Sequence, residues 1–254
     1  MKHLFTSLAA LLVTLAASAQ TICKTYDIKG HIGSINSRRG IEVEYTPSRN
    51  VSVKAYIDKK YADQLKINLS RGVLNIDFSG NTGFNDNGKI KVVLTAPAIA
   101  GYYASQGSEI EVKGKLSVSG AMKIKTTSGS SVEFSHPVSA TSVTANCSQG
   151  SELEFEKSLN CTTLDANISQ GSSFEADNAN VSRANINVSG GSSAEIDGIA
   201  TEVNFTASGA SSISASKLKA TTGSTRASGA SKIKCNVTRL KSSTSGVSSV
   251  KNKK

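Results

Sequence analysis

The sequence contains no tryptophan, only three prolines and few aromatic residues of any kind. Beyond the first twenty residues it has no long apolar stripe with the 3.6-residue period of a helix, which argues against an α-helical protein. No later apolar run is long enough to cross a bilayer, so we expect no membrane-spanning segment. Serine, threonine, asparagine and glycine are abundant instead. This composition favours an all-β protein with many tight turns.

Residues 1–19 have the pattern of a secretory signal peptide. A basic start precedes an apolar run over residues 4–16, and Ala17-Ser18-Ala19 offers a small-residue cleavage site. Residues 20–22 lack the small residue that a lipoprotein signal needs before its cysteine, so we do not expect Cys23 to carry a lipid. The protein is therefore expected to be exported to the periplasm, the outer surface or the extracellular space.

The four cysteines show no disulfide framework and no C-x-x-C motif, and they lack the spacing of a zinc site. In the Ser-Gly repeat of the second half of the chain, Cys147 and Cys235 fall on inward-facing strand positions, where a free thiol acts as a small apolar side chain. Free thiols are the favoured interpretation, and the pattern leaves open whether any disulfide forms.

A motif of the form Ser/Thr-x-Gly/Ala-Ser recurs about every 20 residues through the second half of the chain. A glycine beside a serine in each copy marks a tight turn that tolerates a positive φ. The copies start at Ser105, Thr127, Ser148, Ser169, Ser189, Ser208 and Ser228, with a degenerate copy at Ser245. A serine stands three places after every start, at Ser108, Ser130, Ser151, Ser172, Ser192, Ser211, Ser231 and Ser248.

Apolar and polar residues alternate on both sides of each turn, which predicts strands with one buried face. A repeat of about 20 residues built from such strands is one coil of a parallel β-helix. We therefore expect an all-β, right-handed parallel β-solenoid of about eight coils over residues 104–254. Residues 20–103 lack the repeat but alternate similarly, which predicts a β cap at the N-terminal end. Burial is predicted for Phe134, Phe155, Phe174 and Phe205, and exposure for Glu133, Glu154 and Glu175.

The order of short motifs resembles a known bacterial family. Four short segments precede the first turn motif, Ser105-Gln106-Gly107-Ser108. They are Gly33-Ser34-Ile35-Asn36, residues 40–45, residues 72–76 and Lys91 to Pro97. This order is similar to that of the family described as putative autotransporter adhesin, head GIN domain. The resemblance implies a secreted β-helical protein of a family found largely in Bacteroidetes. It implies no catalytic residue, because the family has none established.

The outward position of the first strand after each turn carries a run of acids. It reads Glu111, Glu133, Glu154, Glu175 and Glu195, followed by Ser214, Lys234 and Lys251. Stacked glutamates about 4.8 Å apart are tolerated on a solvated strand face, which is the favoured interpretation. The alternative is a stripe for divalent cations or a basic partner, because Ca²⁺ requires several carboxylate oxygens at close range.

Charge is unevenly distributed along the chain, whose net charge is +10. Residues 203–254 hold ten Lys or Arg and no acid, whereas residues 150–202 hold nine acids against two bases. The basic coils predict a site for anionic envelope or host glycans, and solubilisation of the last coil is the alternative. A specific nucleic-acid site is not expected, because no aromatics stand beside these lysines. The residues of the predicted anionic site are Lys217, Lys219, Lys232, Lys234, Arg239 and Lys241.

No arrangement typical of an enzyme is present. His136 is the only histidine in the repeats and no Ca²⁺-binding nonapeptide occurs, so we expect no catalytic site and no cofactor. Tyr102 and Tyr103 are the only adjacent tyrosines, and core packing is favoured over a ligand platform. The sequence therefore predicts a noncatalytic, adhesin-like binding or structural module of unknown oligomeric state. A carbohydrate-active β-helix with an unrecognised site is the alternative.

Overall fold

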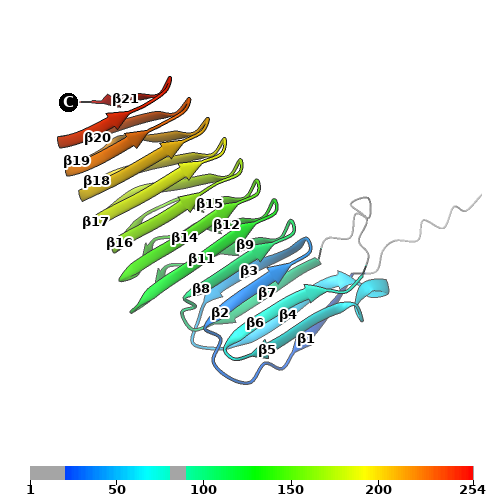
Figure 1. Ribbon diagram of the computed structural model, residues 1–254. Coiled ribbons are helices and arrows are strands. Elements are labelled where there is room, and N and C mark those ends of the chain that lie inside the picture. The colour runs from blue at the N-terminus through cyan, green and yellow to red at the C-terminus, as the bar shows by residue number, and fades with distance from the viewer. Residues whose placement is uncertain (1–20, 81–89, 254) are drawn as a thin grey trace, which may run out of the picture.

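The computed structural model describes residues 21–80 and 90–253, so the expected signal peptide at 1–19 lies outside the described residues. The described chain is almost entirely β-strand, with one short 3₁₀ turn, η1 (Lys59–Tyr61). Its parallel coils stack into a β-solenoid of about seven turns (Figure 1), which confirms the predicted fold class. No helix among these residues has the length and apolar character needed to cross a membrane.

Each coil has three sides, and equivalent strands pair in parallel from coil to coil. The first side, which we call the amide face, is formed by β8 (Gly101–Ser105), β11 (Ala121–Thr127) and β14 (Ser142–Ser148). The second side, the charge face, is formed by β9 (Glu109–Val112), β12 (Ser131–Phe134) and β15 (Glu152–Phe155). The third side contains the short strands β10 (Leu116–Ser117) and β13 (Val138–Ser139).

In the later coils the sides merge into long bent strands that continue the same stack. These strands are β16 (Leu159–Ile168), β17 (Ser173–Ser189), β18 (Ser193–Ser208), β19 (Ser212–Ala227) and β20 (Lys232–Thr244), and β21 (Ser249–Asn252) ends the charge face. Pairing of Ser131 with Glu152 and of Ser142 with Thr163 shows that both faces keep a constant register.

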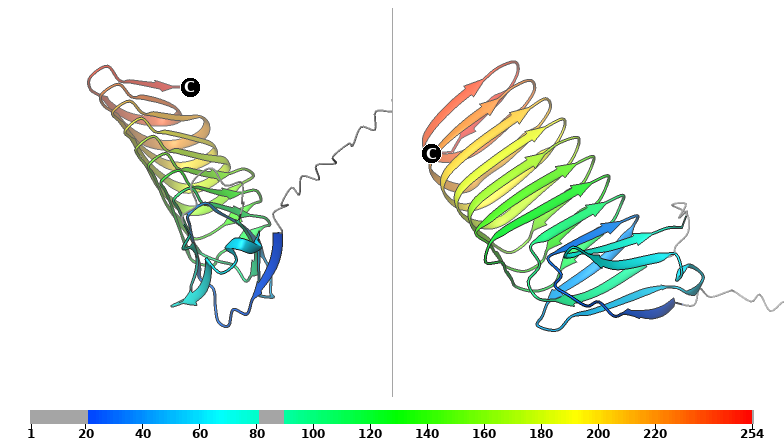
Figure 2. Two further views of the ribbon diagram at one scale, coloured as in Figure 1. Left: turned by 90° about the vertical axis from the view of Figure 1, so that its right-hand side faces the viewer. Right: turned by 60° about the horizontal axis from the view of Figure 1, so that its bottom comes forward.

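The parallel stacking begins within the N-terminal region. There β2 (Ser34–Arg38) lies between β6 (Val73–Phe78) and β8, and β3 (Ile41–Pro47) lies between β7 (Ile90–Ala96) and β9, all in parallel. The antiparallel strands β1 (Thr21–Tyr26), β4 (Ser52–Asp58) and β5 (Leu65–Ser70) complete this end. Figure 2 shows the antiparallel strands at one end of the column and the C-terminus at the other.

In the corners as far as Gly190-Gly191, a two-residue turn with positive φ at both positions connects the amide face to the charge face, whereas the last three corners have a positive φ only at Gly209, Gly229 and Gly246. In the third coil Gln149 (φ 59°) and Gly150 (φ 68°) form the two-residue turn, and the following Ser151 points inward and is buried. Arg39 (φ 65°) and Gly40 (φ 71°) form the same turn between β2 and β3. The N-terminal coil therefore uses the repeat's corner geometry without its Ser-Gly sequence.

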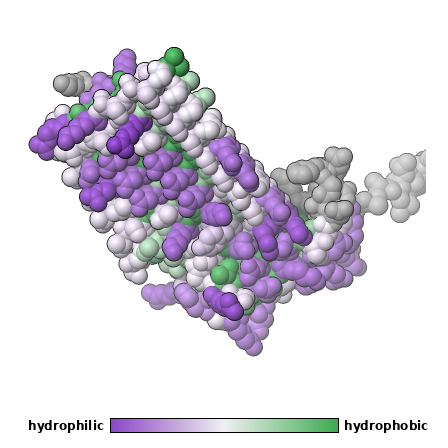
Figure 3. All heavy atoms as spheres, viewed as in Figure 1, coloured by the Kyte–Doolittle hydropathy of each residue, from purple (hydrophilic) through white to green (hydrophobic). Residues whose placement is uncertain are grey.

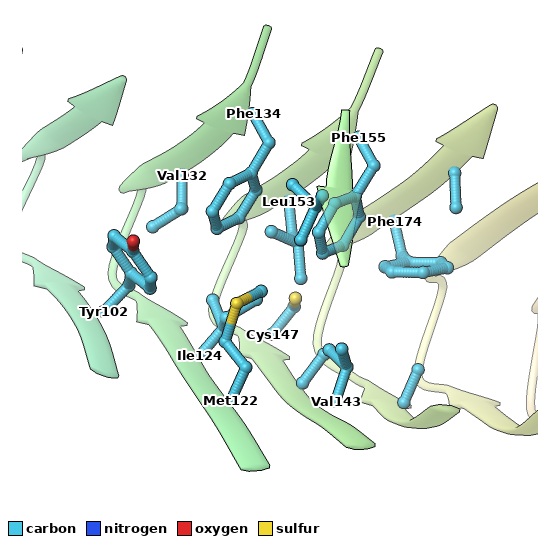
Figure 4. Close-up of a cluster of buried hydrophobic side chains, with 14 of the residues drawn as sticks. Tyr102, Met122, Ile124, Val132, Phe134, Val143, Cys147, Leu153, Phe155 and Phe174 are labelled. Atoms are coloured by element: carbon cyan, nitrogen blue, oxygen red, sulfur yellow. The ribbon is translucent and has the colours of Figure 1, made fainter. Parts of the chain in front are cut away.

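A column of aromatic rings fills the core of the early coils (Figure 4). Phe134 stacks on Phe155 with ring centroids 4.7 Å apart, and Tyr102 and Phe174 extend the column on either side. The predicted burial of all four phenylalanines is confirmed, because each is at most 2 % exposed. Cys147 and Cys235 are buried free thiols as predicted, and Cys161 is a third.

Candidate functional site

The amide face carries two ladders of outward-pointing polar side chains. In one, Asn187 donates to Asn167, which donates to Asn146. In the other, Asn204 donates to Asn185, and Ser224 donates to Asn204. Figure 3 shows hydrophilic side chains gathered over the middle coils. Because each amide bonds the next coil, the face is regular and rigid along the solenoid axis.

Two adjoining shallow grooves lie where the amide face reaches the C-terminal coils. One, of about 650 Å³, is lined by Arg226 and Lys241 beside the amides of Asn187 and Asn204. The other, of about 560 Å³, is lined by Arg239 and Lys241 together with Glu202. Glu202 is paired with Arg183 at 3.0 Å, so its charge is already matched. Among the described residues, the three cations of these grooves have no ion-pair partner, which leaves them available to an anion.

The six basic residues predicted to form one patch lie on all three sides of the coil. Arg239 and Lys241 point outward from the amide face, in register with Thr222 and Ser224. Lys232 and Lys234 lie on the charge face, and Lys217 and Lys219 border the third side. All six side chains are exposed to solvent. Because they lie on different sides of the coil, they do not form one surface. Arg226 was not among the predicted site residues, although its spacing of two from Ser224 places both side chains on the outer surface of the amide face.

A third groove, of about 630 Å³, lies on the amide face near the N-terminal end. Tyr103, Lys125 and Arg71 line it together with Asn36 and Asn75. Tyr102 is buried, as the core interpretation predicted, whereas its neighbour Tyr103 points to the groove. Alternation along β8 already required the two tyrosines to face opposite ways, and this was the signal that sequence reasoning did not use.

The predicted glutamate ladder is present in the predicted register. Glu111 pairs with Glu133, Glu133 with Glu154, and the series continues through Ser214 to Lys234 and Lys251. The prediction of exposure is wrong for Glu133 and Glu154, which are half-buried because neighbouring rungs cover their stems. It is correct for Glu175.

The N-terminal end of this ladder is neutralised within the chain, and the middle is not. Lys113 contacts Glu44 at 2.6 Å and Glu111 at 3.0 Å, and Lys91 contacts Glu42 at 3.2 Å. These lysines, Lys113 first, lower the pKa of Glu44 through hydrogen bonds. From Glu133 to Glu195 no acid of the charge face has a basic partner within the part of the chain that the structure describes.

Crowding of these unmatched acids raises their pKa values. Burial, then a hydrogen bond with Glu156 and the charges of neighbouring acids, raises the pKa of Glu133 to about 7. Burial and then neighbouring carboxylates also raise the pKa of Glu154 and Glu175. The middle of the charge face therefore binds protons more readily than an ordinary carboxylate surface and is suited to binding cations.

Within residues 21–80 and 90–253, no group of three or more His, Cys, Asp or Glu is arranged to hold a metal ion. The ladder acids run in a line and do not converge on one point. Calcium binding by Glu111, Glu133, Glu154, Glu175 and Glu195 thus stays a prediction.

Comparisons with known proteins agree with the fold. The profile of a family described as putative auto-transporter adhesin, head GIN domain, matches residues 33–197 and again 138–254. No curated protein matches the chain. A structure from Parabacteroides merdae, described as a putative adhesin, has a TM-score of 0.81 at 17 % identity, covering 93 % of this chain and 98 % of its own.

Two structures from Parabacteroides distasonis are also similar. One, described as a putative adhesin, has a TM-score of 0.61 at 18 % identity over 93 % of this chain and 95 % of its own. The other, described as a putative lipid binding protein, has a TM-score of 0.59 at 16 % identity over 93 % and 98 %. At these identities the likeness concerns the fold alone.

Proposed function

Because the chain belongs to the family described as putative auto-transporter adhesin, head GIN domain, we propose that it is an exported, noncatalytic binding module of the bacterial envelope or surface. Its ligand is an anionic polymer, such as an acidic glycan or the phosphorylated sugar of an envelope glycolipid, that lies along the amide face. The observation that carries this proposal is the set of unpaired cations, Arg226, Arg239 and Lys241, lining the two C-terminal grooves.

The chemistry of the amide face suits a linear polymer. Asparagine side chains offer both donors and acceptors, and hydroxyl groups of sugars use both. The ladder fixes one amide position per coil about every 4.8 Å, so a chain lying parallel to the axis meets the same groups repeatedly. The cations at the C-terminal end then supply the preference for negative charge, because residues 203–254 contain no acid that would oppose it.

The likeness to a structure described as a putative lipid binding protein is compatible with a glycolipid ligand, because phosphate groups on its sugars would meet the same cations. A carbohydrate-active enzyme is the alternative function. It predicts turnover of a bound glycan, whereas a binding module releases the glycan unchanged.

Binding to heparin and to purified lipopolysaccharide tests the proposal. Arg239→Glu/Lys241→Glu should weaken binding at low salt at least about tenfold, and wild-type binding should fade as the Debye length drops from about 10 Å at 0.1 M to about 3 Å at 1 M salt. Lys217→Glu/Lys219→Glu makes the same change in net charge on the third side and serves as the control. An equal loss in both variants would show attraction to overall charge rather than a site on the amide face.

A further inference from the structure

Charges on the charge face are segregated along the last five rungs. Two acidic rungs, Glu175/Asp177 and Glu195/Asp197, come first. The rung of β19 carries only Ser212, Ser214 and Ser216 and is uncharged. Two basic rungs complete the series, with Lys232 and Lys234 on β20 and Lys251 and Lys253 at the end of the chain. Continuous parallel pairing of Glu175, Glu195, Ser214, Lys234 and Lys251 places all five rungs on one surface.

This arrangement is self-complementary under a two-fold axis that lies between the two faces and runs parallel to β19 over Ser214. Rotation about that axis turns the two faces toward each other, reverses the order of the rungs and keeps the direction of the strands. Glu195 of one copy then faces Lys234 of the other, and Glu175 faces Lys251. Lys232 faces Ser193 and the uncharged serine rung faces itself, so no like charges meet.

From this register we infer that two copies of the chain associate through their charge faces as an antiparallel, two-fold symmetric dimer. Isologous contact between identical patches is the commonest mode of homo-oligomer formation. Each of the two ion pairs occurs twice. The rise from rung to rung is the same in both copies, so the pairs stay aligned across the whole patch.

The monomer leaves these charges unmatched. Lys91 and Lys113 pair with the acids of the first rungs, but no basic side chain among the described residues pairs with Glu175 or Glu195. Lys232, Lys234 and Lys251 likewise have no acidic partner in the described chain. Association would bring these two unmatched sets together. Burial and neighbouring acids also raise the pKa of Glu175, and a partner's lysines would relieve this crowding.

The size of the patch limits the strength of the dimer. Five rungs about 4.8 Å apart and about four residues wide give roughly 300 Å² per copy, well below the ~800 Å² per partner of a standard stable interface. The contact is polar and exposed, so salt screens it. We therefore expect a weak dimer that forms at high micromolar concentration in dilute salt and dissociates near 1 M salt.

Sedimentation equilibrium of the mature protein over a range of concentrations tests this inference. Lys232→Glu/Lys234→Glu should be monomeric, because it sets acids against acids. Glu195→Lys/Asp197→Lys should also be monomeric, because it sets bases against bases. An equimolar mixture of the two variants should dimerise, since the acidic patch of one fits the basic patch of the other. The variant that carries all four substitutions should regain the homodimer.

Circular dichroism confirms that each variant is folded, and Lys217→Glu/Lys219→Glu, outside the patch, should dimerise as the wild type does. A wild type that stays monomeric at every concentration in dilute salt overturns the inference. So does a mixture of the two variants that remains monomeric. Arg239 and Lys241 are outside the patch, so loss of polymer binding and loss of the dimer can be told apart.

Discussion

At the residue scale, the serine that ends each motif has a structural role that its frequency alone did not reveal. Ser108, Ser130, Ser151, Ser172, Ser192, Ser211 and Ser231 are all at most 3 % exposed. In the middle coils they form an internal ladder, in which the Ser151 amide donates to the Ser172 hydroxyl and the Ser172 amide donates to that of Ser192. In these coils the motif therefore stabilises the corner through hydrogen bonding inside it as well as through turn geometry.

Replacing Ser172 with alanine should destabilise the protein by about 1 to 3 kcal/mol, because the buried amide of Ser151 loses its acceptor. Chemical denaturation measures the change in the free energy of unfolding. The neighbouring half-buried Ser173 points out on the charge face, and Ser173→Ala should change stability by no more than about 0.5 kcal/mol. Equal effects of the two substitutions would remove the ladder as an explanation for the motif.

Glu133 should make stability depend on pH near neutrality. Its pKa rises from 4.5 to about 7 on folding, so the folded chain binds more protons between these values. The contribution of Glu133 to the free energy of unfolding should therefore be fully present below pH 4.5, and it should decline as the pH rises through about 7. Melting temperatures should follow this trend in the wild type.

In Glu133→Gln this decline should be smaller, and the variant should melt above the wild type near pH 8, because glutamine carries no charge to bury. Glu202→Gln is the matched control on the amide face. Hydrogen bonds from Asn204 and then Arg183 lower the pKa of Glu202, so its removal should not flatten the neutral-pH decline. A wild type whose melting temperature rises between pH 5 and 8 would contradict the assignment.

At the element scale, the alternation around each turn was sufficient to predict the strands and their register. The outward glutamates occupy the predicted rungs because a period of two leaves no freedom once Val132 and Phe134 face inward. The parallel pairing of β2 with β8 and of β3 with β9 was not predicted, because Arg39-Gly40 forms the corner between β2 and β3 without the Ser-Gly signature. The grooves were also missed, because they depend on which side chains from separate coils become neighbours.

The aromatic column should contribute strongly to the stability of the early coils. Phe155→Ala should cost about 3 to 5 kcal/mol, because it leaves a cavity between Phe134 and Phe174 that neighbouring coils cannot close. Phe155→Leu keeps most of the volume and should cost much less. Urea denaturation compares the two variants, and a Phe155→Ala protein of wild-type stability would show that the column is dispensable.

At the scale of the whole molecule, neutral ladders and charged ladders occupy different sides of one column. Residues 150–202 carry nine acids and two bases, whereas residues 203–254 carry ten bases and no acid. The sequence predicted this separation along the axis, since it needs only the order of the chain. It could not predict the separation around the axis, because the third side adds a variable number of residues to each coil and so decides which face a lysine reaches.

The unmatched acids in the middle of the column should bind Ca²⁺ weakly. Their carboxylates repeat about every 4.8 Å and offer hard oxygen ligands, and a divalent ion would reduce the repulsion that raises the pKa of Glu154 and Glu175. Millimolar Ca²⁺ should raise the melting temperature more than NaCl of equal ionic strength does, and Glu154→Gln/Glu175→Gln should abolish the difference. Asp165→Asn/Glu202→Gln removes two charges from the amide face instead, and in this variant Ca²⁺ should still raise the melting temperature more than NaCl does. Calorimetry without binding heat at millimolar Ca²⁺, or an equal loss in both double variants, would show that the acidic rungs act only as a solvated surface.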